Sequence, residues 1–173
     1  MTGEQRRTAI LQILKEHAGP LSGTALAKSL SVSRQIIVQD IALIRAENHS
    51  ILSTNKGYIY RSDSSDTPLP KRVFYVKHTT QNVLDEFLIV LDLGGSILDV
   101  AVEHEIYGQI RVDLLIETAQ DARDFVERLS CCHDNPLKVL TDDCHYHTVS
   151  APSERLLDLI GQELDAKGFL IRP

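Results

Sequence analysis

Two histidines separated by one residue, His145 and His147, are the clearest candidates for chemistry in this sequence. On a β-strand, residues i and i+2 point to the same face, with Cα atoms about 6–7 Å apart. That spacing lets two imidazoles bind one metal ion. His78 ends an apolar run, and Glu86 follows in the second turn of the next predicted helix. Three imidazoles and a carboxylate suit a borderline divalent ion such as zinc or nickel, so these residues are a candidate metal site.

These histidines also have a simpler interpretation, because exposed histidines on strands are common and a lone His-x-His pair is a weak signal. Cys144 directly precedes His145 and offers a thiol sensor or a soft ligand. Alternation along a strand puts those two residues on opposite faces, which disfavours Cys144 as a ligand. Cys131 and Cys132 bring the cysteine count to three, which does not indicate a disulfide framework.

A second set of candidates lies near the N-terminus. Residues 26–41 predict a short helix, a tight turn and a second helix with Ser33 as its N-cap. Ile37, Ile41 and Ile44 recur at i, i+4 and i+7 and would bury one stripe of that second helix. This is the layout of a helix-turn-helix, whose second helix reads the major groove. The residues of that helix expected to contact DNA are Ser33, Arg34, Gln35, Val38 and Gln39.

The flanking segments favour a helix-turn-helix over an ordinary amphipathic helical hairpin. Residues 6–16 supply a supporting first helix. Pro20 marks its end, because proline cannot continue a helix. Two short β-branched or aromatic runs, 51–53 and 58–60, bracket an Asn/Gly turn and predict a β-hairpin. Three helices followed by a hairpin make a winged helix, and Lys56 at the tip of the wing is expected to meet a phosphate.

The charge of the chain divides into two parts. Residues 1–62 hold 8 Lys or Arg and 4 Asp or Glu, a balance of +4, whereas residues 63–173 hold 10 and 20, a balance of −10. Phosphate contacts supply much of the affinity for DNA, so the positive part is the one expected on the duplex. A polar stretch with two prolines separates them, which predicts domains at 1–61 and 72–173 joined by a linker at 62–71.

The second domain is predicted to be an α+β sandwich with helices packed on a mainly antiparallel sheet, because strands alternate with helices and some strands are consecutive. The expected strands are 72–77, 97–103, 109–117, 137–140, 145–149 and a short 169–172, and the expected helices are 81–93, 119–129 and 154–166. The sequence has no apolar run of about 18 residues or more and no apolar signal core at its N-terminus, so we expect a cytoplasmic protein with no membrane contact.

The ordered pieces resemble a known family. Residues 5–60, through the Ser-Arg-x-x-Ile-x-x-x-Ile run, resemble the winged helix-turn-helix of biotin-repressor-like bacterial regulators. Residues 72–173 resemble the three-histidine (3H) domain. The matching pieces are His78-Thr79-Thr80, Glu86, Val102-Glu103-His104-Glu105-Ile106-Tyr107-Gly108 and His145-Tyr146-His147-Thr148. Together the two parts resemble the niacin-responsive transcriptional repressors (NiaR type).

The resemblance implies a repressor of genes for NAD biosynthesis and niacin salvage or uptake, with nicotinic acid as corepressor and DNA as a partner. It places one divalent metal, nickel or zinc, on His78, Glu86, His145 and His147. The resemblance also places His104 near a ligand pocket, and Tyr107, Tyr146 or Phe74 could stack on the pyridine ring. Glu105 stands where the family usually has proline, which loosens the expectation for the local turn.

We expect a homodimer, because two winged helices about one helical turn apart would match a palindromic operator. Besides a thiol sensor that uses Cys131, Cys132 and Cys144, two other functions stay open at this stage. In a metal-responsive regulator the ion itself would be the signal. In an enzyme the metal would activate water, but the sequence shows no separate nucleophile–base pattern and no Gly-x-Ser-x-Gly. We therefore predict a regulator and not an enzyme.

Overall fold

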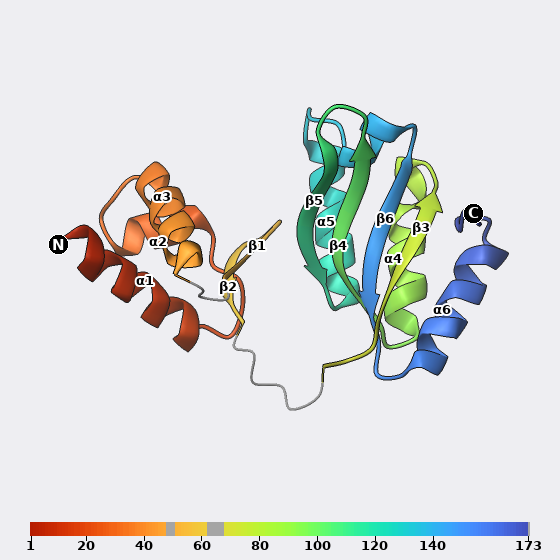
Figure 1. The fold of residues 1–173 in the computed structure, drawn as a ribbon, viewed down its shortest axis with the longest axis horizontal. Helices are drawn as coiled ribbons and strands as arrows, with labels where there is room; N and C mark the ends of the chain where they lie inside the picture. The colour runs from red at the N-terminus through yellow and green to blue at the C-terminus, as the bar shows by residue number, and fades with distance from the viewer. Residues whose placement is uncertain (48–50, 62–67, 173) are drawn as a thin grey trace. The chain divides into compact units, whose positions relative to one another are not determined.

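The computed structural model describes residues 1–47, 51–61 and 68–172, which belong to two compact units, Met1–Asp66 and Thr67–Pro173 (Figure 1). Residues 62–67 of the predicted linker lie outside the described residues, as does the predicted break at residues 48–50. Among the helices that the structure describes, none is both long and apolar enough to cross a membrane.

The first unit has three helices followed by an antiparallel hairpin, which confirms the predicted winged helix-turn-helix. Its elements are α1 (Gly3–Glu16), α2 (Gly23–Ser29), α3 (Arg34–Ala46), β1 (Ile51–Thr54) and β2 (Gly57–Tyr60). The side chains of Thr2, Ser22 and Ser33 cap the three helices, each by accepting the backbone N–H of the residue three positions later. The predicted isoleucine stripe of α3 is buried against α1 and α2.

Two sets of polar contacts fix α3 and the wing to the rest of this unit. The Arg6 guanidinium donates to the buried carboxylate of Asp40, with Nε and Oδ2 2.5 Å apart, and so joins α1 to α3. Leu21, just before α2, exchanges two backbone hydrogen bonds of 2.8 Å with Tyr58 of the wing. Gly57 makes this approach possible: its φ is +134°, and a Cβ there would lie 2.2 Å from the carbonyl oxygen of Leu21.

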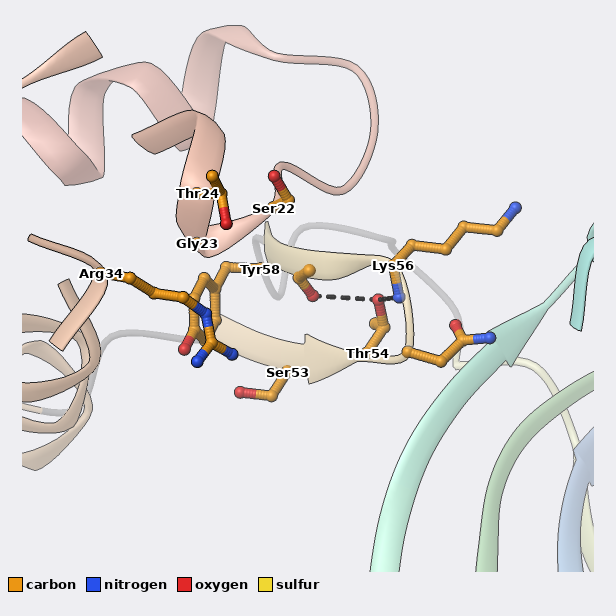
Figure 2. Close-up of a pocket in the computed structure, with 10 residues that line it drawn as sticks. Ser22, Gly23, Thr24, Arg34, Ser53, Thr54, Lys56 and Tyr58 are labelled. Carbon is orange, nitrogen blue, oxygen red and sulfur yellow. Dashed lines mark hydrogen bonds between the residues drawn. The ribbon is translucent and has the colours of Figure 1, made fainter. Parts of the chain in front are cut away.

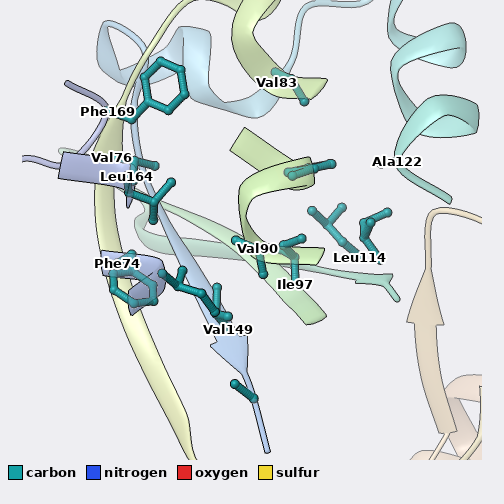
Figure 3. Close-up of a cluster of buried hydrophobic side chains, with 14 of the residues drawn as sticks. Phe74, Val76, Val83, Val90, Ile97, Leu114, Ala122, Val149, Leu164 and Phe169 are labelled. Carbon is teal, nitrogen blue, oxygen red and sulfur yellow. The ribbon is translucent and has the colours of Figure 1, made fainter. Parts of the chain in front are cut away.

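The second unit is a two-layer α+β sandwich. In chain order its elements are β3 (Lys71–Lys77), η1 (Thr80–Asn82), α4 (Val83–Asp92), β4 (Ser96–His104), β5 (Gly108–Ile116), α5 (Ala119–Cys131), η2 (Leu137–Thr141), β6 (Cys144–Ser150) and α6 (Glu154–Ala166). The sheet order is β3-β6-β4-β5, and every neighbouring pair is antiparallel. Helices α4, α5 and α6 contribute to one buried core on one face of the sheet (Figures 1 and 3).

Two strand predictions in this unit are wrong. Residues 137–140 form the 3-10 helix η2, because Pro136 precedes a turn that the Thr141 hydroxyl closes by donating to the carbonyl of Lys138. Within residues 169–172, only Leu170 makes a bridge, an isolated one with Val76 of β3. Strand β3 begins at Lys71, inside the predicted linker.

Candidate metal centre and nucleic-acid interface

The four predicted metal ligands meet beneath the sheet of the second unit. His78 follows the end of β3, Glu86 lies in α4, and His145 and His147 both point from β6 toward that helix. Oε2 of Glu86 lies 2.8 Å from Nε2 of His78, 3.5 Å from Nε2 of His147 and 3.9 Å from Nε2 of His145. All four side chains are at most 5% exposed. Three of them, His78, Glu86 and His145, bring ligand atoms within 4.8 Å of one another.

The outer nitrogen of each imidazole is held by the backbone. Nδ1 of His78 contacts the carbonyl of Thr79 at 2.9 Å, Nδ1 of His145 that of Asp143 at 2.9 Å, and Nδ1 of His147 that of Asp99 at 2.6 Å. A carbonyl oxygen only accepts, so each Nδ1 carries the proton. The lone pair of each neutral ring is then on Nε2 and faces Glu86. Carbonyl partners of this kind fix the tautomer and orientation of metal-ligating histidines.

This donor set fits a divalent transition metal. Three Nε2 lone pairs and a carboxylate oxygen are all acceptors, so bringing them together in a buried space is unfavourable without a cation among them. Without a metal ion, protons on the Nε2 atoms could separate these acceptors, but each added proton gives an imidazole a positive charge. A metal ion would satisfy all four donors, and imidazole nitrogen with carboxylate oxygen is a set that zinc and nickel accept. His78, Glu86, His145 and His147 would hold such an ion.

The electrostatics of the site follow from burial and proximity. When protons rather than a metal ion occupy the cluster, the imidazoles donate to Glu86 from Nε2. Burial then raises the pKa of the Glu86 carboxyl, but the charge of His147 and the hydrogen bonds from the three imidazoles outweigh it and hold that pKa well below its usual range. Burial lowers the pKa of His145. Burial also lowers the pKa of His147, yet the negative charge of Glu86 and their hydrogen bond raise it above its usual value. The site therefore keeps its carboxylate ionised, which is the form that binds a metal.

The residues predicted for the pyridine ligand do not join this cluster. His104 and Tyr107 lie at the β4–β5 turn with ring centroids 4.8 Å apart, and Nδ1 of His104 accepts backbone N–H groups of the turn. Tyr146 stacks on Tyr75 with ring centroids 4.4 Å apart, on the face of the sheet opposite His145 and His147. Phe74 lies in the buried core. A ligand role for these residues stays a prediction.

The predicted DNA-contacting side chains of α3 lie together on an exposed face. Arg34, Gln35, Val38 and Gln39 are all exposed, as is their N-cap Ser33. The buried stripe of isoleucines on the other side explains this, because a helix packed by one face leaves the opposite face to solvent. Their arrangement at the start of α3 is the one in which a recognition helix presents its first turns to base edges.

A pocket that the sequence did not predict lies beside this face (Figure 2). Its volume is about 390 Å³, and it is lined by the start of α2 (Ser22, Gly23, Thr24), by Arg34, and by the wing (Ser53, Thr54, Asn55, Lys56, Gly57, Tyr58). The pairing of Leu21 with Tyr58 brings these segments together. Gly23 lies close to both sides of the pocket, since a Cβ there would be in van der Waals contact with Cε2 of Tyr58 at 3.4 Å and with Nε of Arg34 at 3.5 Å.

The two predicted cations, Arg34 and Lys56, therefore line one polar pocket together with the Ser22 and Thr24 side chains. In the wing, the Thr54 hydroxyl donates to the carbonyl of Gly57 and accepts from the N–H of Lys56, which orders the turn that carries this lysine. Hydroxyl groups and cations at such a place are the donors that contact a DNA backbone. The start of α2 was not part of the DNA-contacting surface predicted from the sequence. Ser22, the N-cap of α2, was the signal that could have indicated it.

A winged helix-turn-helix in the same chain as an α+β unit with a buried His/Glu cluster indicates a class of protein: a DNA-binding transcription regulator with a separate second unit. Comparison with protein families agrees with both parts. Residues 6–59 match the HTH domain model and residues 71–173 match the 3H domain model.

Two relatives match nearly the whole chain. It is 39% identical over 168 residues to the probable transcription repressor NiaR of Thermotoga maritima, covering 97% of this chain and 94% of that one. It is 34% identical over 173 residues to the transcription repressor NadR of Bacillus subtilis, covering 99% and 96%. The chain therefore belongs to the NiaR-type family of transcription repressors, which also confirms that it is a regulator and not an enzyme.

Proposed function

We propose that this chain is a repressor of genes for NAD biosynthesis and niacin salvage or uptake, acting on DNA in the cytoplasm with nicotinic acid as corepressor. The observation that carries the proposal is the convergence of three imidazole Nε2 atoms on one buried carboxylate, in the same chain as a winged helix-turn-helix. Similarity to repressors along nearly the full length supports the DNA-binding part.

The metal gives a physical reason for the second unit to accept an anion. The chain from residue 63 onward has a charge balance of −10, so a free carboxylate would be repelled there. One divalent ion held by His78, Glu86, His145 and His147, nickel or zinc, would supply positive charge that attracts the carboxylate of nicotinic acid. The corepressor strengthens DNA binding only if the DNA-competent arrangement binds it more tightly than the other arrangement does.

On the DNA side, we propose that Arg34, Gln35, Val38 and Gln39 face base edges while Lys56 and the pocket around it contact the backbone. A homodimer would place two such units on the two halves of a palindromic operator. Light scattering of the full chain, with and without DNA, tests the dimer directly. A monomer under both conditions would exclude it.

The experiment that tests the whole proposal is fluorescence anisotropy with a promoter fragment from an NAD-synthesis or niacin-uptake operon. Binding is measured without additive, with nicotinic acid, with nicotinamide, and with each after chelation of the metal. We expect nicotinic acid to tighten binding and chelation to abolish that gain. No response to nicotinic acid by a protein that holds its metal would overturn the corepressor assignment.

One second function is favoured by the same buried cluster: a metal-responsive regulator in which the bound ion is itself the signal. The donor set serves both functions equally well. The two differ in whether the metal exchanges. If added Zn²⁺ or Ni²⁺ alone changes DNA affinity of the chelated protein, and nicotinic acid adds nothing, the ion is the signal.

A further inference from the structure

Lys138 in η2 has an unexpected environment. It is 4% exposed, whereas its apolar neighbours Val139 and Leu140 are 46% and 56% exposed. Folding normally buries apolar side chains and leaves lysine in water, and a fully buried lysine needs partners for its charge. The usual order is inverted within three consecutive residues. A specific role for the buried ammonium accounts for such an inversion.

The two partners of this ammonium both belong to segments that carry metal ligands. Nζ of Lys138 donates to the backbone carbonyl of His78 at 2.5 Å and to Oδ1 of Asp143 at 2.6 Å. His78 is itself a candidate ligand. Asp143 is the residue whose carbonyl accepts the Nδ1 hydrogen of His145, a second candidate ligand. One buried ammonium therefore links the end of β3 to the start of β6, directly beside the cluster.

The segment before β6 has a backbone that needs such a restraint. Asp142 and Asp143 have φ values of +53° and +64°, a left-handed conformation that is unfavourable for residues with a side chain. The carbonyl of Asp143 points at His145 only while this turn is kept. The N–H of Asp143 also donates to the carbonyl of Lys138, so the lysine contacts the turn through both its side chain and its backbone.

We propose that Lys138 is a positioning residue of the metal centre, which acts by tying the carbonyl of His78 to the carboxylate of Asp143 and so fixes His78 and His145 relative to each other. The inference rests on the proposed function, because it requires that the cluster binds a metal. Outer partners that orient ligands typically contribute about 10–100-fold to metal affinity. The β3–β6 ladder ends at the pair Lys77–Cys144, one residue short of both partners of the ammonium. Loss of the ammonium would therefore let the His78 carbonyl and the Asp143 turn shift beyond the end of the ladder.

The chain contains a matched control for this link. Lys77 and Asp142 each precede a residue of the proposed link, and they form an ion pair with Nζ and Oδ2 2.7 Å apart. This pair joins the same two segments, but its side chains are 48% and 92% exposed. An exposed pair contributes little, since water screens it. If the buried link positions ligands, removal of the surface pair should have a far smaller effect.

The experiment compares four forms of the full chain: wild type, Lys138→Met, Asp143→Asn and the control Lys77→Met. Co²⁺ serves as the probe, because its visible absorption bands depend on the number and geometry of its ligands. Each metal-free protein is titrated with Co²⁺, and its melting temperature is measured. A fifth form, Leu157→Ala, lowers stability from α6, near the opposite end of β3 from His78, where Arg72 pairs with Glu154 and Asp158.

We expect Lys138→Met to weaken Co²⁺ binding by about 10–100-fold and to change the Co²⁺ spectrum. Asp143→Asn should weaken binding less, because asparagine still offers an oxygen. Lys77→Met and Leu157→Ala should keep the wild-type affinity and spectrum, the latter despite its lower melting temperature. If Lys138→Met fails to fold, Asp143→Asn carries the same test.

The positioning role would be overturned if Lys138→Met kept the wild-type Co²⁺ affinity and spectrum. If Lys138→Met does not fold, the same result in Asp143→Asn would overturn it. Either result would leave the proposed metal centre intact. Equal losses in Lys138→Met and Leu157→Ala would also overturn it, since general destabilisation would explain both. A wild-type chain that binds no Co²⁺, Zn²⁺ or Ni²⁺ would instead overturn the proposed metal centre itself.

Discussion

The two candidate sites of this chain are built in opposite ways. The proposed recognition face of α3 consists of exposed side chains around Arg34 that are carried by one helix. The candidate metal centre consists of buried side chains from the residue after β3, from α4 and from β6, and each imidazole is fixed by a backbone carbonyl. The side chains of the first site can adjust to the hydrated surface of a DNA groove. The second has its geometry fixed before any ligand arrives.

This difference in burial predicts which site has energetically coupled residues. On the exposed face each side chain contributes nearly independently, so single substitutions should produce modest and roughly additive losses. In the buried cluster the four donors share one space, so removal of some leaves the others without a partner. The predictions below test this contrast, beginning with the cluster.

The largest effect is expected from His145→Ala combined with His147→Ala. Two of four donors are lost, and Glu86 is left buried with His78 as its remaining partner in the cluster. Metal affinity should fall by more than about 100-fold, since even outer partners of metal ligands are worth about 10–100-fold. The metal content of the purified protein should drop to background, and basal DNA binding should persist.

His104→Ala is the matched control, because this histidine lies in the same unit but at the β4–β5 turn, outside the cluster. It should keep a full complement of metal, measured by elemental analysis of the purified protein. A normal metal content in the double variant would reject the ligand assignment. Loss of metal in the control would mean that the centre extends to the turn.

The sequence predicted these two sites to different degrees. Periodicity alone placed the isoleucine stripe of α3 and thereby its exposed face, because a helix is a local structure. The metal cluster needed the family resemblance, since nothing local reveals that residues 78, 86, 145 and 147 meet. The shared pocket of α2 and the wing was missed, because the Leu21–Tyr58 pairing that forms it is non-local.

Residues 137–140 show most clearly what a local pattern cannot predict. The run Leu-Lys-Val-Leu has the composition of a strand, but it follows Pro136, and its lysine has a partner that is far away in the chain. The carbonyl of His78 draws Lys138 inward, and the apolar neighbours are left outside. Burial of a lysine depends on partners that a single sequence does not display.

Gly57→Ala should have the next largest effect, and should act on the first unit alone. At φ +134° its new Cβ would lie 2.2 Å from the carbonyl oxygen of Leu21, so the Leu21–Tyr58 pair must break. Strain and two lost hydrogen bonds should cost about 3 kcal/mol in the free energy of unfolding of this unit. Chemical denaturation followed by circular dichroism measures this cost, and DNA binding should fall with it.

Gly19→Ala is the control, since among the described residues, apart from its two chain neighbours, none has an atom within 4 Å of a Cβ built at Gly19. Its unfolding free energy should stay within about 0.5 kcal/mol of wild type. Metal content should remain normal in both glycine variants, because the cluster belongs to the other unit. Metal loss in Gly57→Ala would contradict the independence of the two sites.

Arg34→Ala should weaken operator binding by about 1–3 kcal/mol, the range for an arginine that contacts a base edge. Arg34→Lys separates the two possible contacts of this side chain. Lysine keeps the charge for a phosphate but loses the planar pair of donors. If Arg34 reads a base, the lysine variant should lose discrimination between operator and scrambled DNA. If it contacts only a phosphate, discrimination should be retained.

Fluorescence anisotropy with the operator duplex and the scrambled duplex measures this discrimination. Unchanged affinity in Arg34→Ala would remove the residue from the interface.

The smallest effect is expected from Lys56→Ala in the wing. This cation lines the pocket beside Arg34, and we expect it to contact a phosphate. Its loss should weaken operator and scrambled DNA equally, by less than about 1 kcal/mol at physiological salt, and should reduce the slope of log affinity against log salt by about 1. A salt titration on both duplexes tests this. A loss confined to the operator would mean that the wing reads sequence, and the division between a base-reading helix and a backbone-contacting wing would have to be redrawn.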